Sequence, residues 1–187
     1  MTFEENHLFH VFNRGNNMEK LFHSRNNYLL FLSKVRKFIL PYCDIVAWCL
    51  MPDHFHLLVK VNYLVKDGIL INFAIGRMLS SYAQAINKQF DRKGSLFQEH
   101  TKAINMTYPE KISPSWYQSF GITVINRYLP ERAYPKLCFE YIHNNPVKAG
   151  LVDNASDWEF SSLQDYLSQR RGTLINREIG NKICNPD

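Results

Sequence analysis

Two histidines flank a single phenylalanine in an otherwise apolar stretch, CLMPDHFHLLVKV (residues 49–61). In a β-strand, side chains two positions apart project from the same face, with their Cα atoms about 6.6 Å apart. His54 and His56 would therefore share one face of a strand, and Phe55 would point to the other. Two imidazoles at this separation can each place a nitrogen about 2.1 Å from one cation. The pair is a candidate for half of a metal site, although such pairs also occur as ordinary core or surface residues.

A third donor must come from another part of the chain, and the best candidate lies in FEYIHNNPVKAGL (139–151). Tyr141 and Asn145 are four residues apart, so they would share one face of a helix. Pro146 disfavours helical geometry at the residue before it, which predicts that the helix ends at Asn145. By themselves, a tyrosine and an asparagine at these positions are more often packing and C-capping residues. Their meaning depends on whether this helix faces the histidines.

The elements that must position these residues follow from hydrophobic periodicity and turn signals. We expect helices at 24–42, 70–94 and 131–145, and strands at 6–13, 43–51, 54–61 and 95–104. The turn MPD would join the second and third strands in a hairpin. The order β-α-β-β-α-β predicts an α+β fold: a ferredoxin-like split β-α-β sandwich with an antiparallel four-stranded sheet and additional C-terminal helices. This scaffold supports many functions, so it decides none of them.

The length of 187 residues suits one domain spanning the whole chain. A stretch near 106–130, rich in proline and aromatic residues, is expected to be an insertion, and the polar tail 170–187 is expected to be loosely ordered. The formal net charge of +5 is compatible with a polyanionic partner. Four cysteines without a CxxC pair argue against a zinc ribbon or disulfide framework. Without a signal-like start or a long apolar run, we expect a cytoplasmic protein.

Four further features occur in a characteristic order along the chain: FHVFNRGNN, WCLMPDHFHLLVKV, GSLFQEHTK, and YIHNNPVKAGLV followed by DWEFSS. In these motifs the chain resembles the REP-associated tyrosine transposases, which belong to the single-tyrosine HUH (His-hydrophobic-His) superfamily. The resemblance covers about residues 8–163 and is interrupted near 106–130. It implies a ferredoxin-like α+β fold, in agreement with the strand order inferred from the sequence.

The resemblance also implies roles for the candidate residues. His54, His56 and Asn145 would bind Mg²⁺ or Mn²⁺, and Tyr141 would be the nucleophile. The implied reaction is cleavage of single-stranded DNA at hairpin-associated sites, which leaves a 5′-phosphotyrosine linkage and a free 3′-hydroxyl, and rejoining reverses it. The implied partners are hairpin-forming DNA and, in some relatives, a second copy of the chain as a homodimer. For contacts to DNA phosphates we select the basic residues Arg14, Lys102 and Lys148.

Some residues depart from or compete with this assignment. Many relatives carry glycine and arginine where this chain has Glu99 and His100, so a phosphate contact is expected to be lost or replaced. Tyr82 is a rival nucleophile, but its helical spacing to apolar residues favours packing. His143 should point away from Tyr141, and we expect it to be neutral or at the surface.

Three other functions remain open on the sequence. The chain could be a metal-dependent hydrolase in which water replaces the tyrosine, with Tyr141 purely structural. It could be a non-catalytic nucleic-acid-binding module, because four-stranded α+β sheets with exposed aromatic residues also bind RNA. It could also be a domesticated enzyme that cuts its sites without mobilising an element.

Overall fold

The computed structural model describes residues 1–108, 116–119, 122–125 and 134–185. Most of the expected insertion near 106–130 lies outside the described residues. Within it, strands β7 (Trp116–Ser119) and β8 (Ile122–Ile125) pair antiparallel as a separate ribbon.

The central feature is a four-stranded sheet with the order β2-β3-β1-β6, in which every neighbouring pair is antiparallel. Its strands are β1 (Leu8–Arg14), β2 (Cys43–Met51), β3 (His54–Val61) and β6 (Lys102–Asn105). Helix α1 (Arg25–Phe38) connects β1 to β2, and α2 (Ile71–Gln89) lies between β3 and β6. This order is the split β-α-β plan, so the predicted fold class is confirmed.

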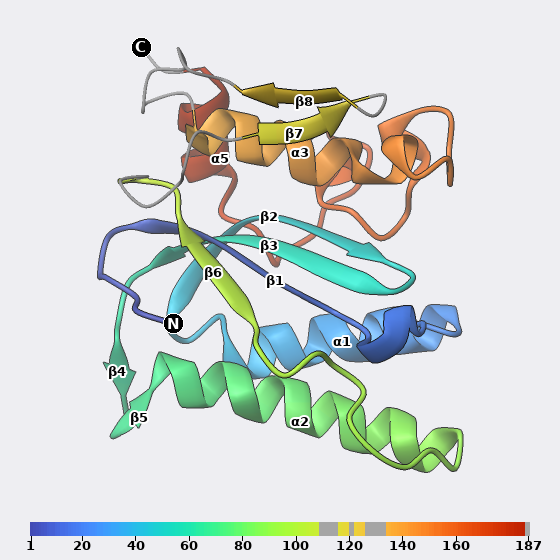
Figure 1. Ribbon diagram of the computed structural model, residues 1–187. Helices are drawn as coiled ribbons and strands as arrows, with labels where there is room; N and C mark the ends of the chain where they lie inside the picture. Colours follow the sequence, from blue (N-terminus) through green and yellow to red (C-terminus); the bar gives the residue numbers. More distant parts are fainter. Residues whose placement is uncertain (109–115, 120–121, 126–133, 186–187) are drawn as a thin grey trace.

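The elements form three layers (Figure 1). Helices α1 and α2 cover one face of the sheet, and α3 (Tyr134–Lys148) covers the other, with α5 (Arg177–Cys184) beside it. The candidate residues of β3 and α3 can therefore meet only on the face that α3 covers. The remaining short elements are η1 (Asn16–Met18), β4 (Val65–Lys66), β5 (Ile69–Leu70), η3 (Ala155–Asp157) and α4 (Leu163–Tyr166).

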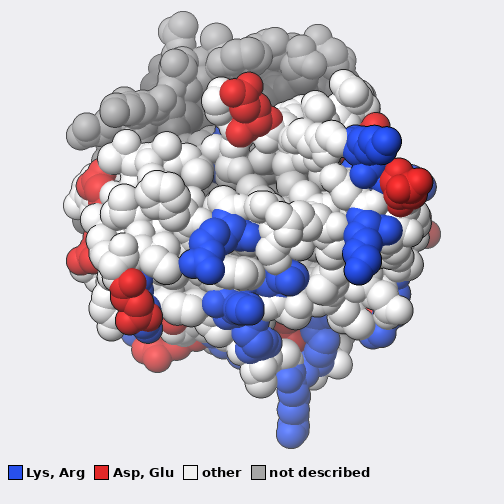
Figure 2. Space-filling model, turned by 90° about the horizontal axis from the view of Figure 1, so that it is seen from below, with Lys and Arg blue, Asp and Glu red and all other residues white. Residues whose placement is uncertain are grey.

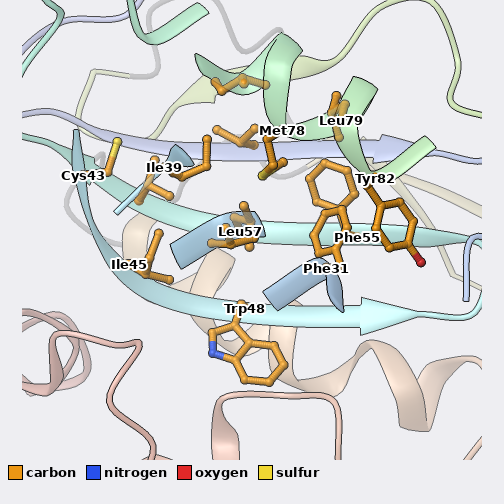
Figure 3. Packing of buried hydrophobic residues seen from close by; sticks show 14 of the residues in the cluster. Phe31, Ile39, Cys43, Ile45, Trp48, Phe55, Leu57, Met78, Leu79 and Tyr82 are labelled. Atoms are coloured by element: carbon orange, nitrogen blue, oxygen red, sulfur yellow. The ribbon is translucent and has the colours of Figure 1, made fainter. Parts of the chain in front are cut away.

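Two apolar clusters hold the layers together. The larger one lies between the sheet and helices α1 and α2, where Phe31, Phe55, Leu57 and Met78 are almost completely buried (Figure 3). The smaller one joins β2 and β3 to α3 and includes Val46, Ala47, Cys49, Met51, Leu58, Phe139 and Ile142. Burial of apolar area at about 25 cal/mol per Å² favours both contacts. The smaller cluster is the one that fixes α3 over the sheet.

A β-bulge in β2 changes which residues face each layer. The register of β2 with β3 shifts between Ile45 and Ala47. Ile45 belongs to the larger cluster, whereas the adjacent Val46 and Ala47 both belong to the smaller one. Such an extra residue bends a strand and increases its local twist.

The predicted end of the third long helix is wrong. Helix α3 continues through Pro146 to Lys148 instead of stopping at Asn145. The backbone N–H of Ala149 donates to the carbonyl of Asn145 at 2.9 Å, and that of Leu151 donates to the carbonyl of Pro146 at 2.9 Å. Ile142, Asn145 and Pro146 are all buried. Their burial outweighs the local preference of a residue before proline for an extended conformation.

The predicted start of the fourth strand is also wrong, since β6 begins at Lys102 and not at residue 95. Residues 95–101 still follow the end of β1. The N–H of Gln98 donates to the carbonyl of Arg14 at 2.9 Å. The side chain of Asn13 donates to the Gln98 carbonyl at 3.1 Å and to the Thr101 hydroxyl at 2.9 Å. These side-chain hydrogen bonds replace a regular ladder there.

The DWEFSS motif (157–162) runs along the outer edge of β2. The N–H of Leu50 donates to the Phe160 carbonyl at 2.9 Å, and the N–H of Ser162 donates to the Trp48 carbonyl at 2.9 Å. Further on, Ile175 forms a parallel bridge with Ile45. Residues of α5 pack against the smaller cluster. The motif therefore covers a sheet edge that would otherwise expose unpaired backbone groups.

Other sequence-based expectations concern cysteines and membranes. All four cysteines are free. Among the residues that the structure describes, no helix combines the length and the apolar character needed to cross a membrane.

Candidate active site

Strand register places the two histidines of β3 on the face that α3 covers. His54 pairs with Arg14 of β1, and His56 pairs with Phe12. Phe55, between them, points into the larger cluster on the opposite face. The His54 and His56 rings lie edge-to-face with their centroids 5.0 Å apart. The sequence spacing thus gives the shared face that it predicts.

Helix α3 brings Tyr141 to the same place. Phe139 and Ile142 face the smaller cluster, while the Tyr141 side chain stays 42% exposed. The Tyr141 ring meets the His56 ring edge-to-face with a centroid separation of 5.5 Å. A phenol and two imidazoles, separated by more than 80 residues in the chain, therefore surround one space.

That space is a pocket of about 270 Å³. Residues from β1, β3, the segment before β6, β6 itself and α3 line it: Phe12, Asn13, Arg14, His54, His56, Gln98, His100, Lys102 and Tyr141. It opens toward solvent, where Tyr141 and Lys102 are exposed. The arrangement combines a candidate nucleophile, candidate metal ligands and basic side chains in one place.

The turn between β2 and β3 holds His54 in a defined orientation. Nδ1 of His54 lies 2.6 Å from Oδ1 of Asp53, and Nε of Arg14 lies 3.5 Å from the other oxygen of Asp53. A carboxylate at Nδ1 favours the tautomer that leaves Nε2 free as a ligand. Asp53 itself is anchored because its carbonyl accepts the N–H of Gly15 at 2.7 Å. A side chain at residue 15 would collide with the Glu19 carbonyl, so the close approach of Glu19 to this position requires glycine.

His56 is more deeply buried than His54, at 5% exposure. Its Nδ1 lies 2.9 Å from Nε2 of His10 on β1. Burial lowers the pKa of His56 well below its usual value, and His10, His54 and Arg14 add to this by charge repulsion. Burial also lowers the pKa of His10 to about 4. Both rings are therefore neutral near pH 7, which is the form that binds metals.

The side chains at the pocket offer some of the donors that the divalent cation implied by the resemblance would need. Nε2 of His56 is buried and has no hydrogen-bond partner among the described residues. A buried polar atom without a partner is costly unless a ligand or water satisfies it. The described residues contain no group of three His, Cys, Asp or Glu side chains able to hold a metal ion. The residues therefore fit a cation bound by two imidazoles, with oxygen atoms of an amide, a phosphate or water completing the shell.

Comparisons with known proteins bear on this fold. No family model and no curated protein matches the chain. The chain is similar to the solved structure of a REP-associated tyrosine transposase bound to a REP hairpin, with a TM-score of 0.62, and the match covers 90% of this chain and 84% of that chain. This chain has the fold of a REP-associated tyrosine transposase. Because the sequence identity is 15%, the likeness extends to the fold, and residue roles must be argued from geometry.

On this transposase fold, Asn145 lies one helical turn after Tyr141 but outside the set of described residues that line the pocket. It is buried, and its amide nitrogen lies 3.4 Å from the carbonyl of Tyr141. In this arrangement the amide faces its own helix.

The predicted basic residues all lie near the pocket of the transposase fold. Arg14 and Lys102 line it, and Nζ of Lys102 lies 5.9 Å from the Phe12 ring centroid. Nζ of Lys148 lies 5.2 Å from the ring centroid of Tyr141. His100 also lines the pocket, and it is one of the two residues at which the resemblance to the transposase motifs is broken. Basic side chains gather on the α1–α2 face too (Figure 2), so positive charge is not confined to the pocket.

The rival nucleophile Tyr82 lies in the larger cluster and is fully buried (Figure 3). Its hydroxyl donates to the carbonyl of Leu21 at 2.7 Å, and burial raises its pKa. It is therefore a packing residue, as its helical spacing predicts.

The sequence predicts that His143 is uncharged or at the surface. The side chain is uncharged near pH 7, but it is buried and does not lie at the surface. Its Nε2 lies 2.8 Å from the hydroxyl oxygen of Ser162, and burial lowers its pKa to about 4. It joins α3 to the DWEFSS segment.

Sequence reasoning missed Asp53 and His10. Asp53 was visible as the neighbour of His54 in the MPD turn. His10 alternates with Phe9 and Val11 on the first strand, which places it on the face opposite to these apolar residues. Its contact with His56 could not be inferred without knowing that β1 pairs with β3.

Proposed function

We propose that this protein is a metal-dependent endonuclease and strand transferase for single-stranded DNA, a transposase that forms a 5′-phosphotyrosine intermediate at hairpin-associated sites. The observation that carries the proposal is the position of Tyr141, whose ring lies 5.5 Å from that of His56 in a pocket that His54 also lines. The fold of a REP-associated tyrosine transposase, solved with a REP hairpin, supports the choice of hairpin DNA as the partner.

In the proposed reaction, the Tyr141 oxygen attacks a backbone phosphorus. A tyrosine O–P bond forms, and the bond from phosphorus to the 3′-oxygen breaks. The phenol proton passes to solvent, and the departing 3′-oxygen takes up a proton, so a free 3′-hydroxyl results. The covalent intermediate conserves the phosphodiester energy, which allows rejoining without ATP. Tyr141 is suited to this role because its side chain is exposed at the pocket while its helix is held by buried neighbours.

Residues around the pocket would assist in different ways. Mg²⁺ or Mn²⁺ held by His54 and His56, and by Asn145 once its amide turns from the Tyr141 carbonyl toward the pocket, would neutralise charge on the scissile phosphate and orient it for attack. Lys148, with Nζ 5.2 Å from the Tyr141 ring centroid, would stabilise negative charge on the attacking oxygen. Arg14 and Lys102 would hold flanking phosphates at the pocket wall. Because Tyr141 and both histidines come from one chain, a single copy supplies this constellation.

Covalent trapping tests the proposal. A single-stranded hairpin oligonucleotide labelled at its 3′ end is incubated with the protein and Mn²⁺, and the products are separated on a denaturing gel. We expect the label to migrate with the wild-type protein and the adduct to fall to background in Tyr141→Phe, with DNA affinity unchanged within about twofold because the phenyl ring remains. Tyr82→Phe is the matched control, since it removes the same hydroxyl from a buried tyrosine and should retain the adduct.

Two other results of this experiment would favour a different function. Cleavage by Tyr141→Phe with both products released would indicate a hydrolase that uses water. Binding without any cleavage by the wild-type protein would indicate a nucleic-acid-binding module.

A further inference from the structure

The buried contact between His10 and His56 has no role in the reaction proposed above, although it touches a candidate metal ligand. The rings are stacked, with centroids 5.0 Å apart and an interplanar angle of 30°. Nε2 of His10 and Nδ1 of His56 are 2.9 Å apart, which is a hydrogen-bond distance. The side chains come from paired strands, with His10 opposite Leu58 and His56 opposite Phe12. They are thus diagonal neighbours on the face that α3 covers.

A hydrogen bond between two neutral imidazoles needs one protonated nitrogen and one lone pair, which allows two arrangements. If His10 donates, His56 must carry its proton on Nε2. If His56 donates from Nδ1, its Nε2 carries a lone pair. The structure gives Nε2 of His56 no partner among the described residues. A buried donor or acceptor without a partner is costly, and a cation can satisfy the lone pair at Nε2 but cannot satisfy an N–H there.

We propose that His10 is a positioning residue that accepts the Nδ1 proton of His56 and so directs the Nε2 lone pair of His56 toward the metal site. This inference rests on the proposed function, because that function gives the lone pair its use. Asp53 would do the same for His54. The two partners differ in charge and burial. Asp53 is a partly exposed carboxylate that pairs with Arg14, whereas His10 is a neutral imidazole that is only 7% exposed. A neutral acceptor avoids burying an unpaired carboxylate beside His56.

Packing alone is the competing explanation, since the His10 ring also meets the Tyr141 ring edge-to-face at a centroid distance of 6.1 Å. Two substitutions separate packing from hydrogen bonding. His10→Phe keeps an aromatic ring and removes the acceptor. His10→Gln removes the ring and offers a carbonyl oxygen as acceptor. A packing role predicts that phenylalanine is the milder change, and a positioning role predicts that glutamine is.

The first measurement is the tautomer of His56 in metal-free protein. Long-range ¹H–¹⁵N correlation spectra of histidine-labelled protein distinguish Nδ1–H from Nε2–H, and His56→Gln identifies the His56 signals among the seven histidines. We expect the Nδ1–H form in the wild type and in His10→Gln. In His10→Phe, where no acceptor faces Nδ1, we expect an Nε2–H form or a mixture.

The second measurement is Mn²⁺ affinity by calorimetry or electron paramagnetic resonance, without DNA. Loss of a hydrogen-bond partner behind a metal ligand costs about 10–100-fold in affinity. We expect this loss in His10→Phe and recovery to within about threefold of wild type in His10→Gln. His7→Phe is the matched control, because His7 precedes the same strand outside the pocket. Urea unfolding checks that each variant is folded.

The outcomes separate the two proposals. An Nε2–H tautomer of His56 in the wild type would overturn the role of His10, as would His10→Phe with unchanged tautomer and Mn²⁺ affinity. Wild-type protein that shows the Nδ1–H tautomer but binds no Mn²⁺ would uphold the contribution of His10 to the tautomer and overturn the metal site of the proposed function.

Discussion

At the scale of single residues, the partner of each buried imidazole decides what that imidazole can do. His54 has the Asp53 carboxylate at Nδ1, and His56 has His10. His143, two residues after the candidate nucleophile, instead has Nε2 at the Ser162 hydroxyl. His54 and His56 line the pocket, whereas His143 joins two elements of the fold. Residue type alone therefore does not separate a candidate ligand from a structural histidine.

The buried His143 predicts a dependence of stability on pH. Burial lowers its pKa from 6.5 to about 4 in the folded protein, whereas the unfolded chain binds the proton at the ordinary value. The free energy of unfolding should therefore fall as the pH decreases from 6.5 to about 4 and lose this contribution fully below that range. The expected loss from His143 is on the order of 3 kcal/mol.

Urea unfolding of metal-free protein at a series of pH values measures this effect. His143→Gln keeps a hydrogen-bonding side chain at Ser162 but cannot titrate, so its stability should fall less steeply across the same pH range. His10 and His56 act in the same direction and remain in both proteins. Identical pH profiles for the two proteins would show that His143 is not the origin of the effect.

At the scale of elements, the position of the proposed nucleophile depends on how α3 packs. Ile142 is fully buried against β2 and β3, and Tyr141 beside it is exposed at the pocket. The helix continues through Pro146 to Lys148, which lies over the Tyr141 ring. Had the helix ended at Asn145, Lys148 would not lie on the same helix as Tyr141. The packing of the smaller cluster thus sets the positions of both Tyr141 and Lys148.

A cavity under α3 should impair cleavage beyond its effect on stability. Ile142→Ala removes buried methyl groups and is expected to destabilise the protein by about 2–5 kcal/mol. Ile86→Ala is the matched control, because Ile86 is equally buried in α2 on the opposite face of the sheet. Under conditions in which both variants are folded, the rate of adduct formation should fall at least about tenfold more in Ile142→Ala, since a small misplacement of a reacting group is costly.

Unfolding curves and single-turnover adduct formation are measured on the same preparations. Equal rates for the two variants would mean that α3 keeps Tyr141 in place without this packing contact.

At the scale of the whole molecule, the sheet separates two surfaces. The pocket lies on the α3 side with Arg14, Lys102 and Lys148 around it. The α1–α2 side carries its own lysine and arginine side chains (Figure 2). Lys37 of α1 lies beside the Phe38 ring. Net charge alone does not identify the surface that would bind the proposed DNA partner. The location of the pocket favours the α3 side.

Salt dependence of DNA binding distinguishes the two surfaces. Each phosphate contact on single-stranded DNA contributes about 0.7 to the slope of log K against log salt. Lys102→Gln should weaken binding and reduce that slope by about this amount. Lys37→Gln is the matched control, because both lysines lie over a phenylalanine ring, at 5.9 Å for Lys102 and 5.4 Å for Lys37. An equal reduction in Lys37→Gln would place DNA on the helical face as well.

The sequence by itself determined the succession of helices and strands along the chain and the hairpin that carries the histidines. The predicted bounds 43–51 and 54–61 match β2 and β3 to the residue. Two apolar runs separated by a tight turn are a local signal, so no distant part of the chain is needed to recognise them. It also identified Tyr141 as a residue that would matter if its helix faced the hairpin. These features depend on local periodicity and turn chemistry, which neighbouring residues carry.

Only the tertiary structure decided the features that depend on distant parts of the chain. The helix passes Pro146 because buried contacts with the sheet outweigh a local preference. The fourth strand starts late because Asn13, on another strand, holds residues 98 and 101 with its side chain. His10 reaches His56 because β1 lies between β3 and β6. Such contacts form between residues far apart in the sequence, so no local pattern specifies them.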